Sequence, residues 1–298
     1  MHVSVLADKV IKYLNPKPNQ NFIDCTIGAG GHTLKILENT APKGKVLGID
    51  QDADALKIVQ AKAKEEKLEN RIVPIKDNFA NVKEIVRKEK FKPVHGILFD
   101  LGLSSNQLQE SNRGFSFQGS ETLDMRYDKE NPITAEKILN FWSKKDLEKI
   151  LEEYGEEQFS KEIAKLIVQK RAEKQITKTN QLVEIIKAAT PGWYHKKKIH
   201  PATKTFQALR IAVNGELKNL KDALPQSIEI LEKQGAIVII SFHSLEDRMV
   251  KNFFKNNEQL LILTKKPVVA QANEIRQNPR SRSAKLRAAR KVEPRLIK

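Results

Sequence analysis

The sequence has little cysteine, no long apolar run and no export signal. One cysteine, Cys25, occurs in 298 residues, which excludes an internal disulfide and a cysteine-rich zinc site. The longest strongly apolar stretch, residues 236–240, is far too short to cross a bilayer. The N-terminal residues lack the charged start and apolar core of a signal peptide. We therefore expect a protein of the reducing cytoplasm with no membrane partner.

Signatures of several enzyme classes are also missing. The sequence contains neither a GxSxG nucleophile elbow nor a phosphate-binding GK[ST] loop, which argues against an α/β-hydrolase and a P-loop NTPase. His32, His200 and His243 stand far apart in the chain, without the spacing of metal ligands. For this reason we expect no zinc or other metal site.

Acidic residues are scarce relative to basic ones. The chain has 37 Asp and Glu against 53 Lys and Arg, a formal net charge of +16, and its pI is near 9.7. Such a surplus favours a polyanionic partner. RNA, DNA and an anionic membrane all satisfy this requirement, and so does a generally basic soluble protein with no such partner. Hydrophobic residues make up 40% of the chain, which is enough to bury a core.

The first part of the chain, up to about residue 105, alternates short apolar runs with amphipathic stretches. The apolar runs, which predict buried strands, are residues 22–27, 45–50, 71–76 and 95–100. The amphipathic stretches, which predict helices, are residues 31–39, 53–68 and 80–90. This alternation is typical of an α/β fold with a parallel sheet covered on both faces.

Helical patterns take over between residues 106 and 200. Four amphipathic helices are expected there, at residues 133–141, 143–153, 158–173 and 178–189. The α/β pattern then returns, with a helix near residues 203–223 and a strand at 235–243. We predict an α/β domain formed by residues 1–105 and 201–298, interrupted by an all-helical, RNA-binding domain at 106–200. The alternative is one compact domain with extra helices.

The C-terminal stretch, residues 276–298, has nine Lys or Arg and a single acid, Glu293. It shows little apolar periodicity, so we predict a basic C-terminal tail. A run of this kind is often only solvated, but arginines also suit phosphate contacts. Arg280 and Arg282 are therefore candidate RNA-binding residues.

The most informative motif joins two carboxylates to a glycine-rich loop. DCTIGAGGH starts with Asp24, and its Gly28, Gly30 and Gly31 let the backbone turn sharply and approach a ligand closely. Asp50 ends the next predicted strand, about 20 residues past the glycines, where a nucleoside-binding α/β fold places the acid that binds a ribose.

The loop admits three interpretations. A dinucleotide dehydrogenase would need GxGxxG around a pyrophosphate, but Thr33 replaces the third glycine and Asp24 is poorly suited to a neighbouring pyrophosphate. S-adenosylmethionine carries an ammonium and a sulfonium but no phosphate, so a nearby carboxylate favours it. The third interpretation is a purely structural turn.

Further candidate residues follow other predicted strands or pair aromatics with arginines. Asp100 ends the fourth strand, where open α/β sheets bind ligands, although an aspartate there also caps turns. RGFSF and LDMRY combine base-stacking and phosphate-binding side chains, or else core aromatics beside surface charges. The candidate substrate-binding residues of these segments and of the basic helix at 200–217 are Arg113, Phe115, Arg126 and Arg210. The segment SFHSLEDR, residues 241–248, follows a predicted strand. Either its polar side chains face a site, or Ser244 only caps the helix that follows.

Taken together, the motifs resemble those of the bacterial small-subunit ribosomal RNA cytidine methyltransferase family. The matching segments, between His2 and Arg287, are HVSVL, DCTIGAGGH, GIDQDADAL, ILFDLGLSSNQL, RGFSF, LDMRY, TFQALRIAVNGEL, ISFHSLEDR and NPRSRSAKLR. The resemblance implies a class I S-adenosylmethionine-dependent methyltransferase with a Rossmann-like, doubly wound, mostly parallel sheet and a helical insertion. It also implies methylation of the exocyclic amine of a cytidine in the decoding region of 16S rRNA, either naked or in the small ribosomal subunit, and no DNA partner.

By the same resemblance, the cofactor contacts fall on Gly30, Gly31, His32, Asp50, Phe79, Asp100 and Gln107. This chain departs from the family pattern at Thr122 and Tyr127, and DLGLS replaces the [DNS]PP[YF] motif of many amino-group methyltransferases. We expect Asp100 to accept a hydrogen bond from the amine, with Ser104 or Ser105 behind it. Two other classes stay open, a nicotinamide-dependent oxidoreductase and a non-enzymatic RNA-binding ribosome assembly factor.

Overall fold

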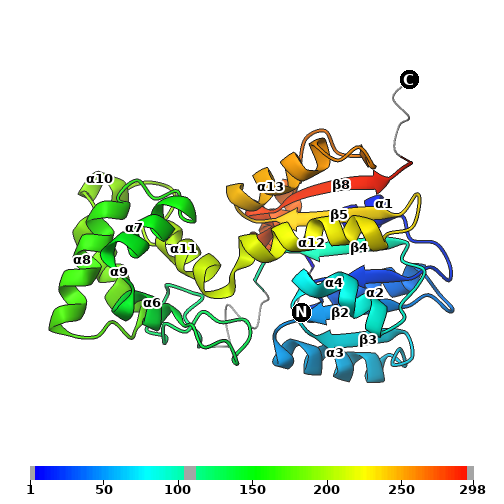
Figure 1. Cartoon of the computed structure of the whole chain (residues 1–298), viewed down its shortest axis with the longest axis horizontal. Helices are drawn as coiled ribbons and strands as arrows, with labels where there is room; N and C mark the ends of the chain where they lie inside the picture. The colour runs from blue at the N-terminus through cyan, green and yellow to red at the C-terminus, as the bar shows by residue number, and fades with distance from the viewer. Residues whose placement is uncertain (1–3, 104–111, 294–298) are drawn as a thin grey trace. The chain divides into compact units, whose positions relative to one another are not determined.

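The chain separates into two compact units in a computed structural model that describes residues 4–103 and 112–293. One unit, here the α/β unit, comprises Met1–Gly102 and Leu217–Lys298. The other, here the helical unit, comprises Leu103–Glu216. The elements of both are labelled in Figure 1. No helix in the described ranges combines the length and the apolar character needed to span a bilayer.

The described part of the α/β unit forms one eight-stranded sheet. Its order is β3-β2-β1-β4-β5-β8-β6, and β7 pairs with β8. The strands are β1 (Phe22–Asp24), β2 (Val46–Asp50), β3 (Ile72–Lys76), β4 (Gly96–Asp100), β5 (Ala236–Ser241), β6 (Leu260–Ile262), β7 (Val268–Val269) and β8 (Lys285–Lys291). The first five strands are parallel, and β8 is antiparallel to its three neighbours. A dinucleotide-binding sheet, with order 3-2-1-4-5-6, has no such antiparallel strand inside it.

Helices cover both faces of this sheet because successive strand residues point to opposite sides. Ile97 and Phe99 pack with α4, α12 and α13, whereas Leu98 packs with α1, α2 and α3. The helical elements of the unit are α1 (Ala7–Leu14), α2 (Gly31–Asn39), α3 (Ala53–Glu65), η1 (Phe79–Asn81), α4 (Val82–Lys88), α12 (Glu216–Ile230), α13 (Ser244–Lys255), α14 (Ala272–Gln277) and η2 (Pro279–Ser283). The predicted doubly wound α/β architecture is confirmed.

The predicted basic tail is wrong for residues 285–291, which form β8 inside the sheet. Its buried positions are filled by Leu286, Ala288 and Ala289 rather than by bulky residues, so the sequence shows little apolar pattern. Arg287 is also buried, and its Nε donates to Asp247 Oδ1 of α13 at 2.6 Å. Part of the basic charge in this segment therefore serves the fold.

The helical unit has its own hydrophobic core. Its helices are α6 (Ala135–Phe141), α7 (Lys144–Glu153), α8 (Ser160–Glu173), α9 (Thr179–Ala189), α10 (Gly192–His195) and α11 (Thr203–Asn214). The first four lie where the sequence predicts helices. The single helix predicted near 203–223 is instead two, because Gly215 adopts a left-handed conformation (φ 62°) that ends α11. α11 packs Phe206 and Leu209 into the helical core, although the sequence analysis assigned residues 201–216 to the α/β domain.

Replacing Arg287 by Met should destabilise the protein, because the largely buried Asp247 would lose a cationic partner at 2.6 Å, while Lys285 lies 3.8 Å away. We expect the free energy of unfolding to fall by about 3 kcal/mol, as when a buried ion pair is broken. Urea unfolding followed by circular dichroism measures this change. Arg282→Met is the matched control, since Arg282 is exposed, and should cost less than about 0.5 kcal/mol. An equally small loss for both variants would contradict the structural role of Arg287.

Candidate active site

Three aspartates end neighbouring parallel strands of the α/β unit. Asp24 is the last residue of β1, Asp50 of β2 and Asp100 of β4. Because these strands are parallel and in the order β2-β1-β4, their carboxyl ends meet at one edge of the sheet (Figure 1). Ligands of open α/β sheets bind at this edge. The strand order therefore brings the three predicted cofactor acids to one region of the sheet.

The glycine-rich loop between β1 and α2 is held by the second of these acids. Gly28 has a φ of 50°, and its N–H donates to Asp50 Oδ2 at 3.0 Å. Gly30, the residue before α2, has a φ of 80°, and a Cβ on it would lie 3.1 Å from Val59 Cγ2. Both positions need the conformational freedom of glycine. Gly31 begins α2 itself.

Asp50 is negatively charged at neutral pH but only weakly acidic. Burial raises the pKa of its carboxyl from 3.8 to about 6, while the N–H groups of Asp52 and Gly28 oppose that shift. Each carboxylate oxygen accepts one of these backbone hydrogen bonds. An oxygen of this kind has further lone-pair capacity for a ligand hydroxyl. Asp50 therefore both supports the glycine loop and offers an acceptor beside it.

Asp24 is more deeply buried than Asp50 and is hydrogen-bonded to the same loop. Its carboxylate, 1% exposed, accepts hydrogen bonds from Thr26 N at 3.2 Å and from Thr33 Oγ1 at 2.8 Å. Burial raises the pKa of Asp24, and the nearby His32 opposes this shift. Asp24 thus ties the end of β1 to the glycine loop and to α2.

Asp100 faces the buried side chain of His32, which α2 carries. His32 Nε2 lies 3.3 Å from Asp100 Oδ2. The backbone N–H of Asp100 donates to Thr26 Oγ1 at 2.7 Å, which ties the end of β4 to the glycine loop. Among the described residues, the buried Asp100 Oδ1 has no hydrogen-bond partner. Such an oxygen is uncommon in folded proteins and fits a donor group of a bound molecule.

Phe79 lies in η1, just after β3, and is half-buried. Its ring packs edge-on against Phe99 of β4, with ring centroids 5.5 Å apart. An aromatic ring at the end of a strand is a suitable wall for an adenine. Gln226 of α12 fixes the turn, because its Nε2 donates to Ala80 O at 2.6 Å.

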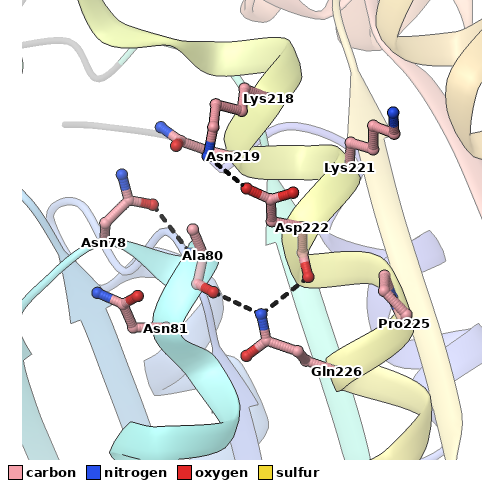
Figure 2. A pocket seen from close by; sticks show the side chains of 9 residues that line it. All are labelled: Asn78, Ala80, Asn81, Lys218, Asn219, Lys221, Asp222, Pro225 and Gln226. Atoms are coloured by element: carbon pink, nitrogen blue, oxygen red, sulfur yellow. Dashed lines mark hydrogen bonds and ion pairs between the residues drawn. The ribbon is translucent and has the colours of Figure 1, made fainter.

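A pocket of about 540 Å³ lies between η1 and the start of α12 (Figure 2). Its lining is mostly polar and consists of Asn78, Ala80, Asn81, Lys218, Asn219, Lys221, Asp222, Pro225 and Gln226. Lys218 Nζ donates to Asp222 Oδ2 at 2.7 Å, so part of its charge is internally paired. None of the described cofactor candidates is among these lining residues. Asn78 and Ala80 of this lining flank Phe79, so the pocket adjoins that cofactor candidate.

The junction after β5 contains a buried histidine and glutamate. His243, not the predicted Ser244, precedes α13 and accepts from Glu246 N, while Glu246 Oε2 accepts from Phe242 N at 2.8 Å. A Cβ on Gly102 would lie 2.6 Å from the ring of Phe242. The segment that follows Asp100 therefore packs directly on this junction. The sequence analysis singled out the segment but not the close approach to Gly102.

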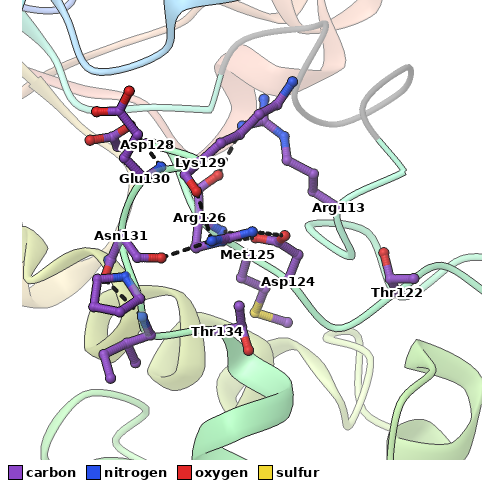
Figure 3. Close-up of polar contacts among 12 residues, drawn as sticks. Arg113, Thr122, Asp124, Met125, Arg126, Asp128, Lys129, Glu130, Asn131 and Thr134 are labelled. Carbon is purple, nitrogen blue, oxygen red and sulfur yellow. Dashed lines mark hydrogen bonds and ion pairs between the residues drawn. The ribbon is translucent and has the colours of Figure 1, made fainter.

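The predicted substrate arginines of the helical unit have internal partners. Arg126 forms a two-pronged ion pair with Asp124 and also donates to two backbone carbonyls (Figure 3). Arg113 is 8% exposed and donates to Arg126 O and Tyr127 O. Its guanidinium lies 5.5 Å from the centroid of the buried Phe115 ring. These side chains hold the segment that precedes α6 in shape.

The other candidates are spread over the chain. Arg210 forms a two-pronged ion pair with Glu216, at 2.8 and 2.9 Å. Burial lowers the pKa of Arg280 in η2, whereas Arg282 in the same turn is exposed. Ser104, Ser105 and Gln107 lie outside the described residues.

The charge at the strand ends fits a cationic cofactor better than a pyrophosphate. Three carboxylates, one with a buried oxygen that has no hydrogen-bond partner among the described residues, suit an ammonium and a sulfonium. Together with the sheet order, this site defines a class I S-adenosylmethionine-dependent methyltransferase. The model of the MraW methylase family matches residues 1–292, and the chain belongs to that family. The nicotinamide-dependent and non-enzymatic alternatives are thereby replaced.

Relatives support the same assignment. A protein of Heliobacterium mobile named ribosomal RNA small subunit methyltransferase H is 42% identical over 311 residues, which cover 98% of this chain and 99% of that protein. A protein of the same name from Sulfurihydrogenibium azorense is 45% identical over 294 residues, with the same coverage. A crystal structure of a candidate rRNA methylase from Clostridium thermocellum has a TM-score of 0.50 and 14% identity and covers 98% of this chain and 100% of its own, which supports the fold alone.

Cofactor affinity should fall as the pH drops through about 6. Asp50 attracts the cationic cofactor only when its carboxyl is ionised. Because its pKa is raised to about 6, the carboxyl is mostly ionised above pH 6 and mostly protonated below it. If the protonated form does not bind, the Kd for S-adenosylmethionine rises about tenfold between pH 7.5 and pH 5. Calorimetric titration at several pH values measures this rise.

Two variants separate the contributions to this pH dependence. Asp50→Asn should bind more weakly and lose the dependence near pH 6, whereas Asp24→Asn should keep it. An unchanged pH profile in Asp50→Asn would assign the titration to another group, with the raised pKa of Asp24 as the alternative source.

Proposed function

We propose that this protein methylates small-subunit ribosomal RNA, and that its target is the exocyclic amine of a cytidine in the decoding region. The names of its relatives support the ribosomal RNA substrate. The resemblance of its motifs supports the cytidine and its position. The observation that carries the chemistry is the Asp100 carboxylate at the carboxyl ends of the strands, whose buried Oδ1 has no hydrogen-bond donor within residues 4–103 and 112–293. An rRNA substrate places the reaction in the cytoplasm.

Glycines and acids of the α/β unit would hold the cofactor, which supplies the methyl group when bound. Asp50 is placed to accept hydrogen bonds from the ribose hydroxyls. Gly30 in the turn, and Gly31 and His32 at the start of α2, would contact the rest of the cofactor, and Phe79 would form a wall for its adenine. The Gln107 contact rests on the family resemblance, and the roles of Ser104 and Ser105 rest on their position after Asp100 in the sequence.

Asp100 would act on the amine. The lone pair of a cytidine amine is delocalised into the ring, so the amine is a weak nucleophile and must be aligned with the methyl group. Positioning alone supplies up to about 7–11 kcal/mol in well-oriented systems. Asp100 Oδ1 would accept one N–H, align the lone pair and stabilise the positive charge that develops on nitrogen. His32 Nε2 lies 3.3 Å from Oδ2, within ion-pair distance when the imidazole is protonated.

The target cytosine must unstack from its neighbours to reach the carboxyl ends of the strands. This unstacking costs a few kcal/mol in a duplex and less in a loop. RNA contacts through phosphates and shape supply the compensating affinity. The predicted RNA-binding role of residues 106–200 is part of this proposal. Arg280 and Arg282 stay candidate phosphate contacts of the α/β unit.

Transfer of labelled methyl from S-adenosylmethionine tests the proposal. Unmodified small ribosomal subunits, naked rRNA and tRNA are incubated in parallel, and the nucleosides are then separated. We expect label only in small-subunit rRNA, as a cytidine methylated on its exocyclic amine. Transfer to another nucleoside, or to no RNA despite measurable cofactor binding, would contradict the proposed substrate.

Asp100→Asn should lower turnover at saturating cofactor by about 100-fold or more, because the amide keeps the shape but not the charge of the carboxylate. Single-turnover methyl transfer measures this loss, and calorimetry measures cofactor affinity separately. Asp8→Asn is the control, since Asp8 is an exposed acid of the same unit. Full turnover of Asp100→Asn with normal cofactor binding would overturn the assigned role.

A further inference from the structure

The helical unit carries an exposed aromatic and basic surface around α10. It is formed by Trp193, Lys196, Lys197, Lys198 and Ile199, here called the α10 surface, which are all exposed. Trp193 is 56% exposed and Ile199 is 60% exposed. Large apolar side chains in this position, next to three consecutive lysines, are not needed for the core.

The charge of the α10 surface is not neutralised by nearby residues in the sequence. No Asp or Glu occurs between Glu184 and Glu216. The basic residues of that stretch are Lys187, Lys196, Lys197, Lys198, Lys204 and Arg210. One acid that contacts the segment is Glu157, which is 3% exposed and accepts a hydrogen bond from the Tyr194 hydroxyl at 2.8 Å. The surface therefore offers positive charge to a partner.

Its tryptophan is supported by an aromatic cluster. The Trp193 ring centroid lies 5.9 Å from that of Phe159 and 6.0 Å from that of the buried Tyr194. Lys197 Nζ lies 4.9 Å from the centroids of both the Trp193 and the Tyr194 rings. Such contacts hold an indole in place before a ligand arrives. Binding then costs little side-chain entropy.

We infer that the α10 surface binds an unpaired segment of the RNA substrate. The lysines would contact phosphates, and the Trp193 ring would stack on a base, as aromatic side chains do in single-stranded RNA recognition. A protein partner is less suited, because lysine is depleted in protein–protein interfaces. The inference rests on the proposed function, since it assigns part of the affinity for ribosomal RNA to this surface.

The test compares the affinity of full-length variants for an unmodified small-subunit rRNA transcript. Trp193→Ala should weaken binding about tenfold, and Trp193→Phe should keep most of the affinity. Replacing Lys196, Lys197 and Lys198 together by Gln should reduce the slope of log Kd against log salt by about 2, the value for three lost phosphate contacts. All variants should bind S-adenosylmethionine as the parent does.

Matched controls separate this surface from general charge. Replacing Lys144, Lys145 and Lys149 of α7 by Gln removes the same charge from other exposed positions of the helical unit. In a Trp142→Phe background, Trp193 is the only tryptophan. Its fluorescence should then be quenched by the transcript but not by heparin, a polyanion without bases.

Four results would overturn the inference. They are unchanged RNA affinity of the α10 variants, an equal loss in the α7 control, weaker binding only to assembled subunits, and weaker binding only to anionic phosphatidylglycerol vesicles. The third would assign the surface to a ribosomal protein and the fourth to a lipid surface. Methyl transfer by the parent protein tests the proposed function separately. RNA binding through Trp193 without methyl transfer would support the surface and reject the function.

Discussion

The convergence of three aspartates at the carboxyl ends of neighbouring strands is the constraint on which the site depends. Asp24, Asp50 and Asp100 end adjacent strands, and burial raises the pKa of both Asp24 and Asp50. Hydrogen-bond donors next to Asp50 and Asp24 stabilise the ionised form of these two carboxyls. The N–H of Gly28 donates to Asp50, and the hydroxyl of Thr33 donates to Asp24. His32 Nε2 lies 3.3 Å from Asp100 Oδ2. The glycine loop, the start of α2 and the end of β4 are thus arranged around the same electrostatic demand, which a cationic cofactor would satisfy further.

The central strands could be predicted because they are short apolar runs that end in an aspartate, and burial on both faces requires such runs. Strand β8 could not, because its buried positions are filled by alanines and by an arginine paired with Asp247. The division of residues 203–223 into two helices depends on the left-handed Gly215. A glycine inside an amphipathic pattern does not by itself predict a left-handed conformation.

Site residues were predictable where the backbone determines their position and less so elsewhere. The ends of parallel strands converge, so the cofactor acids could be named from their spacing. The role of an arginine depends on a partner that the pattern does not reveal. Arg126 and Arg210 look like substrate-binding residues in the sequence, yet each forms a two-pronged ion pair with an acid of its own unit. Trp193 was overlooked because a tryptophan beside a helix end usually belongs to a core.

The position of the insertion between β4 and β5 has a consequence for how the chain folds. These strands are neighbours in the sheet, yet their ends, Asp100 and Ala236, are separated in sequence by the whole helical unit. Closing so long a loop is slow. Helices α6 to α9 make mostly local contacts and can form early, which shortens the effective loop. The insertion would then act as an intramolecular folding aid, and variants that loosen its core would delay completion of the sheet without touching a strand.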